Sequence, residues 1–432
     1  MPKLTFNKLK NTDAIWLPQV PEHWELVKVR HLFKESTRKG FPDETLLVAS
    51  QEHGVVSKDT YGKRTVEATK DLQNLKLVEQ GDFVISLRSF QGGIELAHVR
   101  GIISPAYTVM KETRQIEKRY FKNLFKSLPF ISLMTLCVKG IREGQNIDYP
   151  TFKNEYLPFP PLEEQKAISA YLDKKNNEID QFIRNKERLI ELLEERKKKV
   201  ISKNISQWIH YELKESGISW IGKIPTHWCV LNLKYLLKSK LKYGANEEAK
   251  DANPEDPRYI RITDFGFDGK LSNDTFRSLP LRKAKEYLLN EGDILFARSG
   301  ATVGKTFQFK EYKGLACFAG YLIKASPNTK KILSDFLYLY TQSSLFEEWK
   351  NGIFDKATIE NIGADKYAVL KVIVPPIDEQ KEIIAFVQNE SSEINLAISK
   401  AQKEISSIKE YREALITDLV TGKRSVSQLQ RI

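Results

Sequence analysis

The sequence predicts an α/β (α+β) protein in which two strand-rich domains are separated and bridged by two long helices that pair as an antiparallel coiled coil. The first observation behind this prediction is a duplication: Pro-Pro-Leu-Glu-Glu-Gln-Lys at 160–166 returns as Pro-Pro-Ile-Asp-Glu-Gln-Lys at 375–381, an offset of 375 − 160 = 215. The second is that apolar residues after each copy step by four and three positions, the 3.5-residue period of a coiled-coil seam. Together they predict an internal pseudo-twofold repeat.

Each long segment also carries the signals of a helix start. Prolines end the preceding strand, and acidic residues occupy the first turn, where the helix dipole favours negative charge. From Glu163 to Ser206 the first segment has 44 residues, roughly 65 Å at about 1.5 Å per residue. Such a helix cannot bury its apolar stripe in one small domain, so we expect it to pair with its own copy. The alternative is two unrelated surface helices, each packed on a neighbouring domain. The expected seam consists of Ile179, Ile183, Ile190, Leu193, Val200, Ile394, Ile398, Ile405, Ile408 and Leu415.

The repeat divides the 432 residues into a first domain at 1–161, a long helix and junction at 162–211, a second domain at 212–376, and a long helix with a C-terminal tail at 377–432. No run approaches the ~18 consecutive apolar residues of a membrane span, and residues 1–10 are too polar for a signal peptide, so we expect a cytoplasmic protein. The three cysteines lack Cys-x-x-Cys spacing and indicate neither a disulfide framework nor a structural zinc site.

The net charge of +12 is unevenly distributed along the chain. Residues 1–161 and 220–376 each hold 24 Lys and Arg against 18 Asp and Glu, whereas 162–219 (12 − 11) and 377–432 (8 − 9) cancel. Two basic domains on a neutral rod suggest two contacts with one polyanion, and nucleic acid is the leading candidate. A merely solvated basic surface is the alternative.

A second duplication opens each domain. Trp-Leu-Pro-Gln-Val-Pro-Glu-His-Trp at 16–24 returns as Trp-Ile-Gly-Lys-Ile-Pro-Thr-His-Trp at 220–228. Both copies continue into an apolar-polar run, which predicts a proline-fixed turn followed by a half-buried strand or short helix. His23 and His227 have no Cys, Asp or second His at metal-ligand spacing, so we interpret both as structural. We expect the tryptophans to anchor the cores.

Within each domain a Gly-Asp turn precedes a buried strand that ends in Arg-Ser, at 81–89 and again at 292–299. Strands are expected at 83–87, 102–109, 259–262, 294–296 and 368–374, and helices at 117–126 and 330–350. Between these fixed points the two copies diverge. One scaffold with different loops predicts the same task on two different targets.

The run Gly-Ala-Thr-Val-Gly-Lys-Thr at 300–306 imitates a phosphate-binding loop but has three residues, not four, between Gly and Gly-Lys-Thr. The residues after it do not predict a helix, so we interpret it as a loop that presents polar side chains to DNA. We find no nuclease, His-Glu-x-x-His or amino-methyltransferase motif, and we expect no catalytic residue and no metal site.

The Pro-Pro-x-x-Glu-Gln-Lys copies, the Gly-Asp to Arg-Ser turns and Ala-Leu-Ile-Thr-Asp-Leu-Val-Thr-Gly-Lys at 414–423 resemble the specificity subunit of type I restriction-modification enzymes. The resemblance implies two target-recognition domains, each reading one half of a split DNA sequence, joined by conserved helices. It also implies docking of two DNA methyltransferase subunits and recruitment of ATP-dependent restriction subunits. S-adenosylmethionine, ATP and Mg²⁺ would then belong to those partners, and this chain would hold no cofactor.

Candidate DNA contacts are polar residues of the diverging loops. In the first domain they are Lys63, Arg64, Arg88, Ser89, Gln91, Arg142, Gln145 and Asn146. In the second they are Arg298, Ser299, Thr302, Lys305, Lys356 and Thr358. For each one the alternative is a solvated surface residue. From another functional class, the alternative for the whole chain is a coiled-coil scaffold whose basic domains bind proteins rather than DNA.

Overall fold

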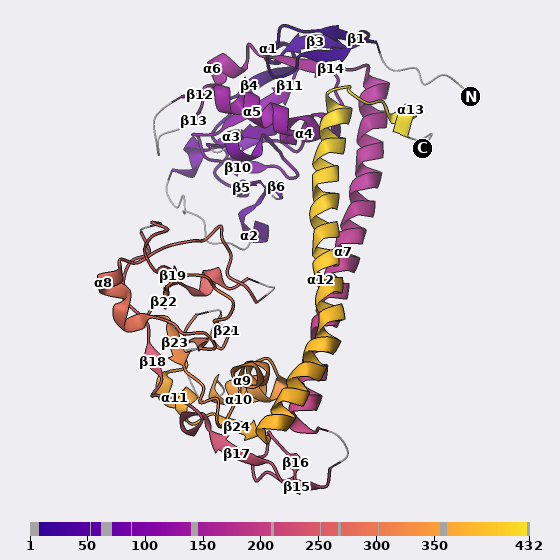
Figure 1. Cartoon of the computed structure of the whole chain (residues 1–432). Coiled ribbons are helices and arrows are strands. Elements are labelled where there is room, and N and C mark those ends of the chain that lie inside the picture. Colours follow the sequence, from indigo (N-terminus) through magenta and orange to yellow (C-terminus); the bar gives the residue numbers. More distant parts are fainter. Residues whose placement is uncertain are drawn as a thin grey trace, which may run out of the picture. The chain divides into compact units, whose positions relative to one another are not determined.

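The computed structural model of the chain describes residues 8–51, 53–61, 71–87, 89–139, 146–208, 211–250, 252–266, 269–300, 302–354 and 361–429. By internal contacts the chain divides into unit 1, Met1–Asn185 with Glu404–Ile432, and unit 2, Lys186–Lys403. Each unit contains one strand-rich domain and half of each long helix, α7 (Leu162–Ser206) and α12 (Ile377–Val420), which Figure 1 labels. This division cuts both helices near their middle, whereas the boundaries predicted from the sequence lie at helix ends.

Unit 1 is built on a four-stranded antiparallel sheet in the order β4-β11-β8-β9. These strands are β4 (Phe33–Ser36), β11 (Thr108–Glu112), β8 (Phe83–Ile85) and β9 (Glu95–Leu96). The smaller antiparallel pairs are β1 (Leu9–Asn11) with β2 (Gln19–Pro21), β3 (Glu25–Lys28) with β14 (Tyr156–Phe159), β5 (Leu47–Ser50) with β6 (Gly54–Ser57), β7 (Lys76–Val78) with β10 (Gly101–Ile103), and β12 (Val138–Lys139) with β13 (Asn146–Ile147).

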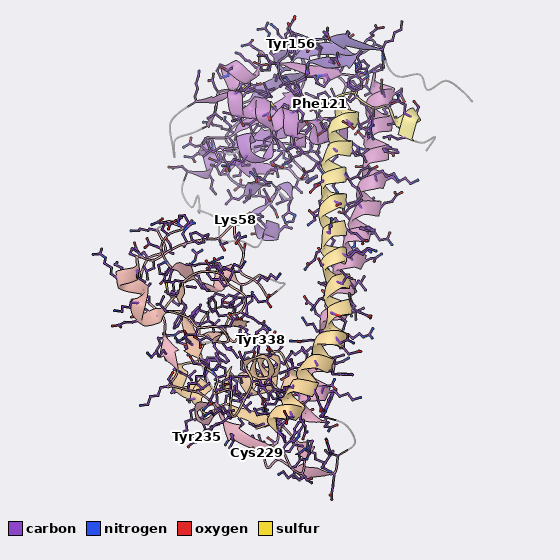
Figure 2. All side chains as sticks on the ribbon, viewed as in Figure 1. Lys58, Phe121, Tyr156, Cys229, Tyr235 and Tyr338 are labelled. Atoms are coloured by element: carbon purple, nitrogen blue, oxygen red, sulfur yellow. The ribbon has the colours of Figure 1, made fainter. Side chains whose placement is uncertain are left out.

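An aromatic core fills unit 1 between this sheet and helix α4 (Lys118–Lys126). Helix α4 buries Tyr120, Phe121, Leu124 and Phe125, which recur at helical spacing and form its apolar face. Phe121 meets Phe33 of β4 edge to face at 5.5 Å, and Figure 2 labels its position. Such aromatic pairs contribute about 0.5–1.5 kcal/mol beyond simple burial. The other helical elements are α1 (Val29–Leu32), α2 (Lys58–Tyr61), η1 (Leu72–Asn74), α3 (Ser89–Gly92), α5 (Leu128–Leu136), α6 (Tyr149–Phe152) and α13 (Val426–Leu429).

Unit 2 repeats this plan with the sheet order β18-β23-β20-β21. These strands are β18 (Lys242–Tyr243), β23 (Leu322–Ala325), β20 (Ile294–Ala297) and β21 (Thr306–Gln308). The smaller pairs are β15 (Leu213–Glu215) with β16 (Lys223–Pro225), β17 (Cys229–Asn232) with β24 (Lys371–Val374), and the parallel pair β19 (Arg258–Ile260) with β22 (Ala316–Phe318). The helical elements are η3 (Leu233–Tyr235), η4 (Ile262–Asp264), α8 (Leu281–Ala284), η5 (Lys285–Tyr287), α9 (Ser334–Thr341), α10 (Ser344–Phe354) and α11 (Ala364–Ala368).

The two duplicated motifs meet at the start of each long helix. In unit 1 the Glu164 carboxylate accepts a hydrogen bond from Nε1 of Trp24 at 3.0 Å and lies 2.8 Å from Nε2 of His23. The equivalent residues in unit 2 are Glu379, Trp228 and His227, at 2.9 and 2.8 Å. Trp24 and Trp228 are 1% and 0% exposed, so they anchor the cores as predicted. Each histidine contacts the carboxylate at the start of its long helix, which is compatible with the structural interpretation.

A buried glutamine completes this helix-start joint. The side-chain oxygen of Gln165 accepts from the backbone nitrogen of Glu117 at 2.9 Å, and its amide nitrogen donates to the carbonyl of Pro160 at 2.8 Å. Gln165 is 0% exposed, so both bonds are shielded from water. It ties α7 to the domain through two backbone groups that would otherwise be unsatisfied. Gln380 does the same for α12 in unit 2, with Leu333 and Pro375.

The two long helices run side by side (Figure 1) and bury the predicted seam. All ten predicted seam residues are buried or half-buried, whereas Glu187 and Glu191 between them on α7 are exposed. The coiled-coil prediction is therefore confirmed, and the period of 3.5 residues explains it because it keeps one face of each helix on its partner.

Among the polar contacts that cross the helix pair, two are equivalent by the repeat. In unit 1 the guanidinium of Arg412 binds the carboxylate of Asp180, and in unit 2 the amine of Lys197 donates to the side-chain oxygen of Asn395 at 2.8 Å. Asn395 is the repeat equivalent of Asp180, and Arg412 is the repeat equivalent of Lys197, because 395 − 180 and 412 − 197 both equal 215, the offset of the repeat. From Asp180 to Lys197 the residue number on α7 rises, whereas the number of the partner on α12 falls from 412 to 395, so the helices are antiparallel.

Two sequence predictions of single elements were wrong. The strand expected at 102–109 is two strands, β10 and β11, because Tyr107 N bonds to Ser104 O and closes a turn between them. The helix expected at 330–350 is α9 and α10, separated at Ser343. The Ser343 hydroxyl donates to the carbonyl of Tyr340 at 2.7 Å and accepts from the backbone nitrogen of Phe346 at 3.4 Å. A serine that bonds in both directions ends one helix and begins the next.

Candidate nucleic-acid interface

The most complete candidate site lies in unit 2, where Arg298 follows the last residue of β20. Its backbone nitrogen donates to the carbonyl of Tyr321 at 3.1 Å, and its own carbonyl accepts from the nitrogen of Ile362 at 2.8 Å. The guanidinium carbon lies 4.9 Å from the centre of the Tyr243 ring. Arg298 is thus fixed at its backbone by two neighbouring segments and stacked at its head on an aromatic face.

Tyr243 is itself held in position. Its hydroxyl oxygen accepts a hydrogen bond from the backbone nitrogen of Ala364 at 2.9 Å, although 43% of the residue is exposed. Tyr321, which accepts the Arg298 backbone bond, is 67% exposed. One aromatic ring therefore lies against the guanidinium of Arg298 at the surface of unit 2, and a second exposed tyrosine is bonded to its backbone; aromatic rings beside arginines are typical of nucleic-acid contacts.

The loop after Arg298 brings the other predicted residues of this site to the surface. Thr302 and Lys305 are exposed, and Ser299 is half-buried and pairs with Asn361 in an isolated bridge. The amine of Lys305 donates to the carbonyl of Phe265 at 3.4 Å. The loop continues into β21 and not into a helix, so it lacks the helix N-terminus that a phosphate-binding loop requires, as the sequence predicted.

In unit 1 the equivalent loop is built differently. Arg88 lies outside the described residues, and Gln91 is exposed on α3. Ser89 is 1% exposed, and its hydroxyl accepts from the backbone nitrogen of Ser86 at 2.9 Å. A buried hydroxyl of this kind shapes the turn and does not offer itself to a ligand, which is a correction to its place among the candidate contacts.

Six further candidate DNA contacts lie outside the described residues: Lys63, Arg64, Arg142, Gln145, Lys356 and Thr358. Asn146 begins β13, and its side chain is also outside what the structure describes. Their contact with DNA stays a prediction.

Sequence reasoning missed a lysine that supports the α3 loop. Lys126 at the end of α4 binds the carboxylate of Glu95 and donates to the carbonyls of Gly92 at 2.8 Å and Gln51 at 3.3 Å. Glu95 is 3% exposed, and burial raises its pKa despite the neighbouring ammonium. This buried pair connects the α3 loop to the segment after β5. Nothing in the sequence marks Lys126, the last residue of an ordinary amphipathic helix.

Tyr243 and Tyr321 were also missed. A signal exists for Tyr243: the stretch 238–243 alternates lysines with other residues and ends in an aromatic residue, the composition of a basic strand edge. Tyr321 sits in the tight turn before β23 and follows a glycine, and no pattern marks it.

In the residues that the structure covers, no three His, Cys, Asp or Glu side chains gather where they could hold a metal ion. Among those same residues, no helix combines the length and apolar character needed to cross a membrane.

The fold and the site together define a two-domain recognition protein: one scaffold built twice around a helix pair, with different outer loops on each copy. Comparison with known proteins gives the family. The model of the type I restriction modification DNA specificity domain matches the chain twice, at residues 21–194 and 225–407, and the chain belongs to this family.

Relatives of similar length extend over nearly the whole chain. The type I restriction enzyme MjaVIII specificity subunit of Methanocaldococcus jannaschii is 25% identical over 443 aligned positions, covering 99% of each chain. The StySPI specificity subunit of Salmonella potsdam is also 25% identical, covering 98% of this chain and 84% of the relative. A chain from a solved type I R-M system, described for its complex assembly and conformational transition, shares the fold with a TM-score of 0.66 at 17% identity, over 94% of this chain and 99% of that one.

Proposed function

We propose that this chain is the DNA-reading subunit of a type I restriction-modification complex and that it reads a split double-stranded target, one half with each unit. The repeat carries the proposal. Both units use the same strand order and the same helix-start joint. Between the first and third strands of the sheet, however, unit 1 has β5, β6, α2, η1 and β7, whereas unit 2 has β19, η4, α8 and η5. A constant scaffold with two different outer surfaces suits two different sequences.

The helix pair would set the distance between the two half-sites. Helices α7 and α12 run through both units, and a continuous helix is stiff along its length. DNA half-sites read by a rigid protein must match the spacing and rotation of its readers, about 34–36 Å per turn of duplex. The length of α7 and α12 would therefore select the number of unread base pairs between the half-sites.

The chemistry would belong to partner subunits. The relatives are named as specificity subunits of restriction enzymes, and the solved structure that shares the fold belongs to a study of the assembly of a type I R-M system. By analogy we expect this chain to dock two DNA methyltransferase subunits and, in the complete enzyme, ATP-dependent restriction subunits. S-adenosylmethionine, ATP and Mg²⁺ would bind to those partners, and the chain itself would be non-catalytic and work in the cytoplasm with the host DNA.

The alternative of a coiled-coil scaffold for protein partners loses its support, because the family match covers both domains and names DNA specificity. The proposal is tested by reconstituting the chain with its methyltransferase and methylating a random-sequence DNA library. Sequencing of the modified molecules should yield one motif with two specified blocks and an unspecified spacer of fixed length. A single contiguous block, or methylation by this chain alone, would contradict the proposal.

A further inference from the structure

We propose that Arg298 reads a guanine in the half-site contacted by unit 2, with Tyr243 as the platform that holds it. The inference rests on the proposed function and adds to it the identity of one base and of the side chain that selects it. The observation behind it is that the charged side chain of Arg298, at the end of β20, has a buried donor without a hydrogen-bond partner.

The guanidinium of Arg298 has no acceptor among the described residues. Its Nε is buried and makes no hydrogen bond, and the described part of the chain offers it no ion pair. Other arginines at the surface of the units do have acids: Arg38 and Arg100 bind Glu79, and Arg119 binds Asp173. The two Nη groups of Arg298 are not among the buried atoms that lack a partner, so they are the donors that an acceptor from outside can reach.

The position of the guanidinium is fixed before any ligand arrives. Two backbone bonds hold Arg298 at the end of the strand, the Tyr243 ring lies against its head, and Ala364 N fixes that ring through its hydroxyl. The Tyr243 ring covers one flat face of the guanidinium, and because Nε is buried, the edge formed by the two Nη groups is the one that can meet an acceptor from outside. That edge matches two coplanar acceptors about as far apart as its own N–H groups.

Two acceptors in DNA have this geometry: the O6 and N7 edge of guanine and the oxygens of a phosphate. The fixed plane favours guanine, because a phosphate can be approached from many directions and needs no stacked platform. The exposed Lys305 in the same loop is better suited to a phosphate, since a flexible lysine acts as a point charge. Ser299 and Thr302 beside Arg298 also have side chains that can reach base edges.

Four substitutions and one control distinguish a guanine contact from a phosphate contact. Arg298→Lys keeps the charge but loses the two-pronged donor edge, and Arg298→Gln offers the amide that pairs with adenine. Tyr243→Ala removes the platform, whereas Tyr243→Phe keeps the ring and loses only the bond to Ala364. Lys242→Ala is the matched control: it removes one positive charge from the neighbouring strand residue, whose side chain points to the opposite face of the sheet.

The experiment is methylation of the random-sequence library by the complex containing each variant, compared with the wild-type complex. We expect the wild-type motif to contain a G·C pair in one half-site at which Arg298→Lys and Tyr243→Ala each reduce discrimination, Arg298→Lys by roughly 5- to 150-fold. Arg298→Gln should shift that position toward A·T, while Lys242→Ala and the other half-site remain as in wild type. Tyr243→Phe keeps the ring but loses the bond that fixes it, so it should reduce discrimination less than Tyr243→Ala. Near-ultraviolet circular dichroism of each variant shows that it is folded.

Each other outcome is decisive. Equal weakening of all sequences by Arg298→Lys identifies a phosphate contact and overturns the inference while leaving the proposed function intact. A motif without any G·C pair sensitive to Arg298 overturns it as well. A folded wild-type complex that prefers no sequence would overturn the proposed function itself, and the inference with it.

Discussion

The helix-start joint gives the sharpest stability prediction. In Gln165→Ala the backbone nitrogen of Glu117 and the carbonyl of Pro160 both lose their only side-chain partner, at a position that is 0% exposed. A buried backbone group without a partner costs about 1–3 kcal/mol. Two such groups predict a loss of about 2–6 kcal/mol from the free energy of unfolding of unit 1, before any contribution from the cavity.

The measurement is amide hydrogen exchange in increasing urea, read by mass spectrometry, because it reports the opening free energy of each unit separately. Gln165→Ala should lower protection in unit 1 only, and Gln380→Ala should do the same in unit 2. The matched control is Lys166→Ala at the next position. The Lys166 side chain is exposed and makes a surface ion pair with Glu163 at 2.8 Å, and such pairs contribute at most about 1 kcal/mol. A Gln165→Ala effect below about 0.5 kcal/mol, or one that appears in unit 2, would refute the reasoning.

Three further predictions concern the helix pair and the α3 loop. Burial lowers the pKa of the half-buried Lys197 below its usual 10.5, so its charge costs stability at low pH, and this cost is lost as pH rises from the lowered pKa to 10.5. Thermal unfolding should show Lys197→Met more stable than wild type by about 1 kcal/mol at pH 7 and the difference shrinking in alkali. Lys126→Met should cost about 3–5 kcal/mol by stranding Glu95, and less in acid, where Glu95 takes up a proton; denaturation at pH 5 and 8 tests this. Deleting 186–189 and 401–404 together should shorten the preferred spacer in methylation mapping; an unchanged spacer refutes the helix as ruler.

The helix pair and the joint were the parts most open to prediction from sequence. Seam residues such as Ile183 and Ile398 repeat every 3.5 positions over long segments, and a periodic signal of that length outweighs local ambiguity. The duplicated Glu164 and Glu379 marked the helix starts. What the duplicated motifs do there was not predictable, because Gln165 bonds to backbone groups and one of them, the nitrogen of Glu117, lies 48 positions away along the chain.

The recognition loops resisted prediction for a different physical reason. Arg298 became a candidate because it recurs after a Gly-Asp turn, but Tyr243, whose ring lies against it, belongs to another strand, and only tertiary structure brings the two together. Ser89 shows the opposite error: the repeat marked it equally well, yet the chain uses it inside a turn. A repeat identifies equivalent positions, whereas exposure depends on loops that differ between the copies.

The central claim, two readers on one spacer, is tested most directly by single-molecule methylome sequencing of a host with and without this gene, in the presence of its methyltransferase. The account predicts that removal of the gene abolishes methylation at one split motif, with two specified blocks at a fixed separation, and at no other motif. Loss of a contiguous motif, or an unchanged methylome while the methyltransferase is active, would contradict it.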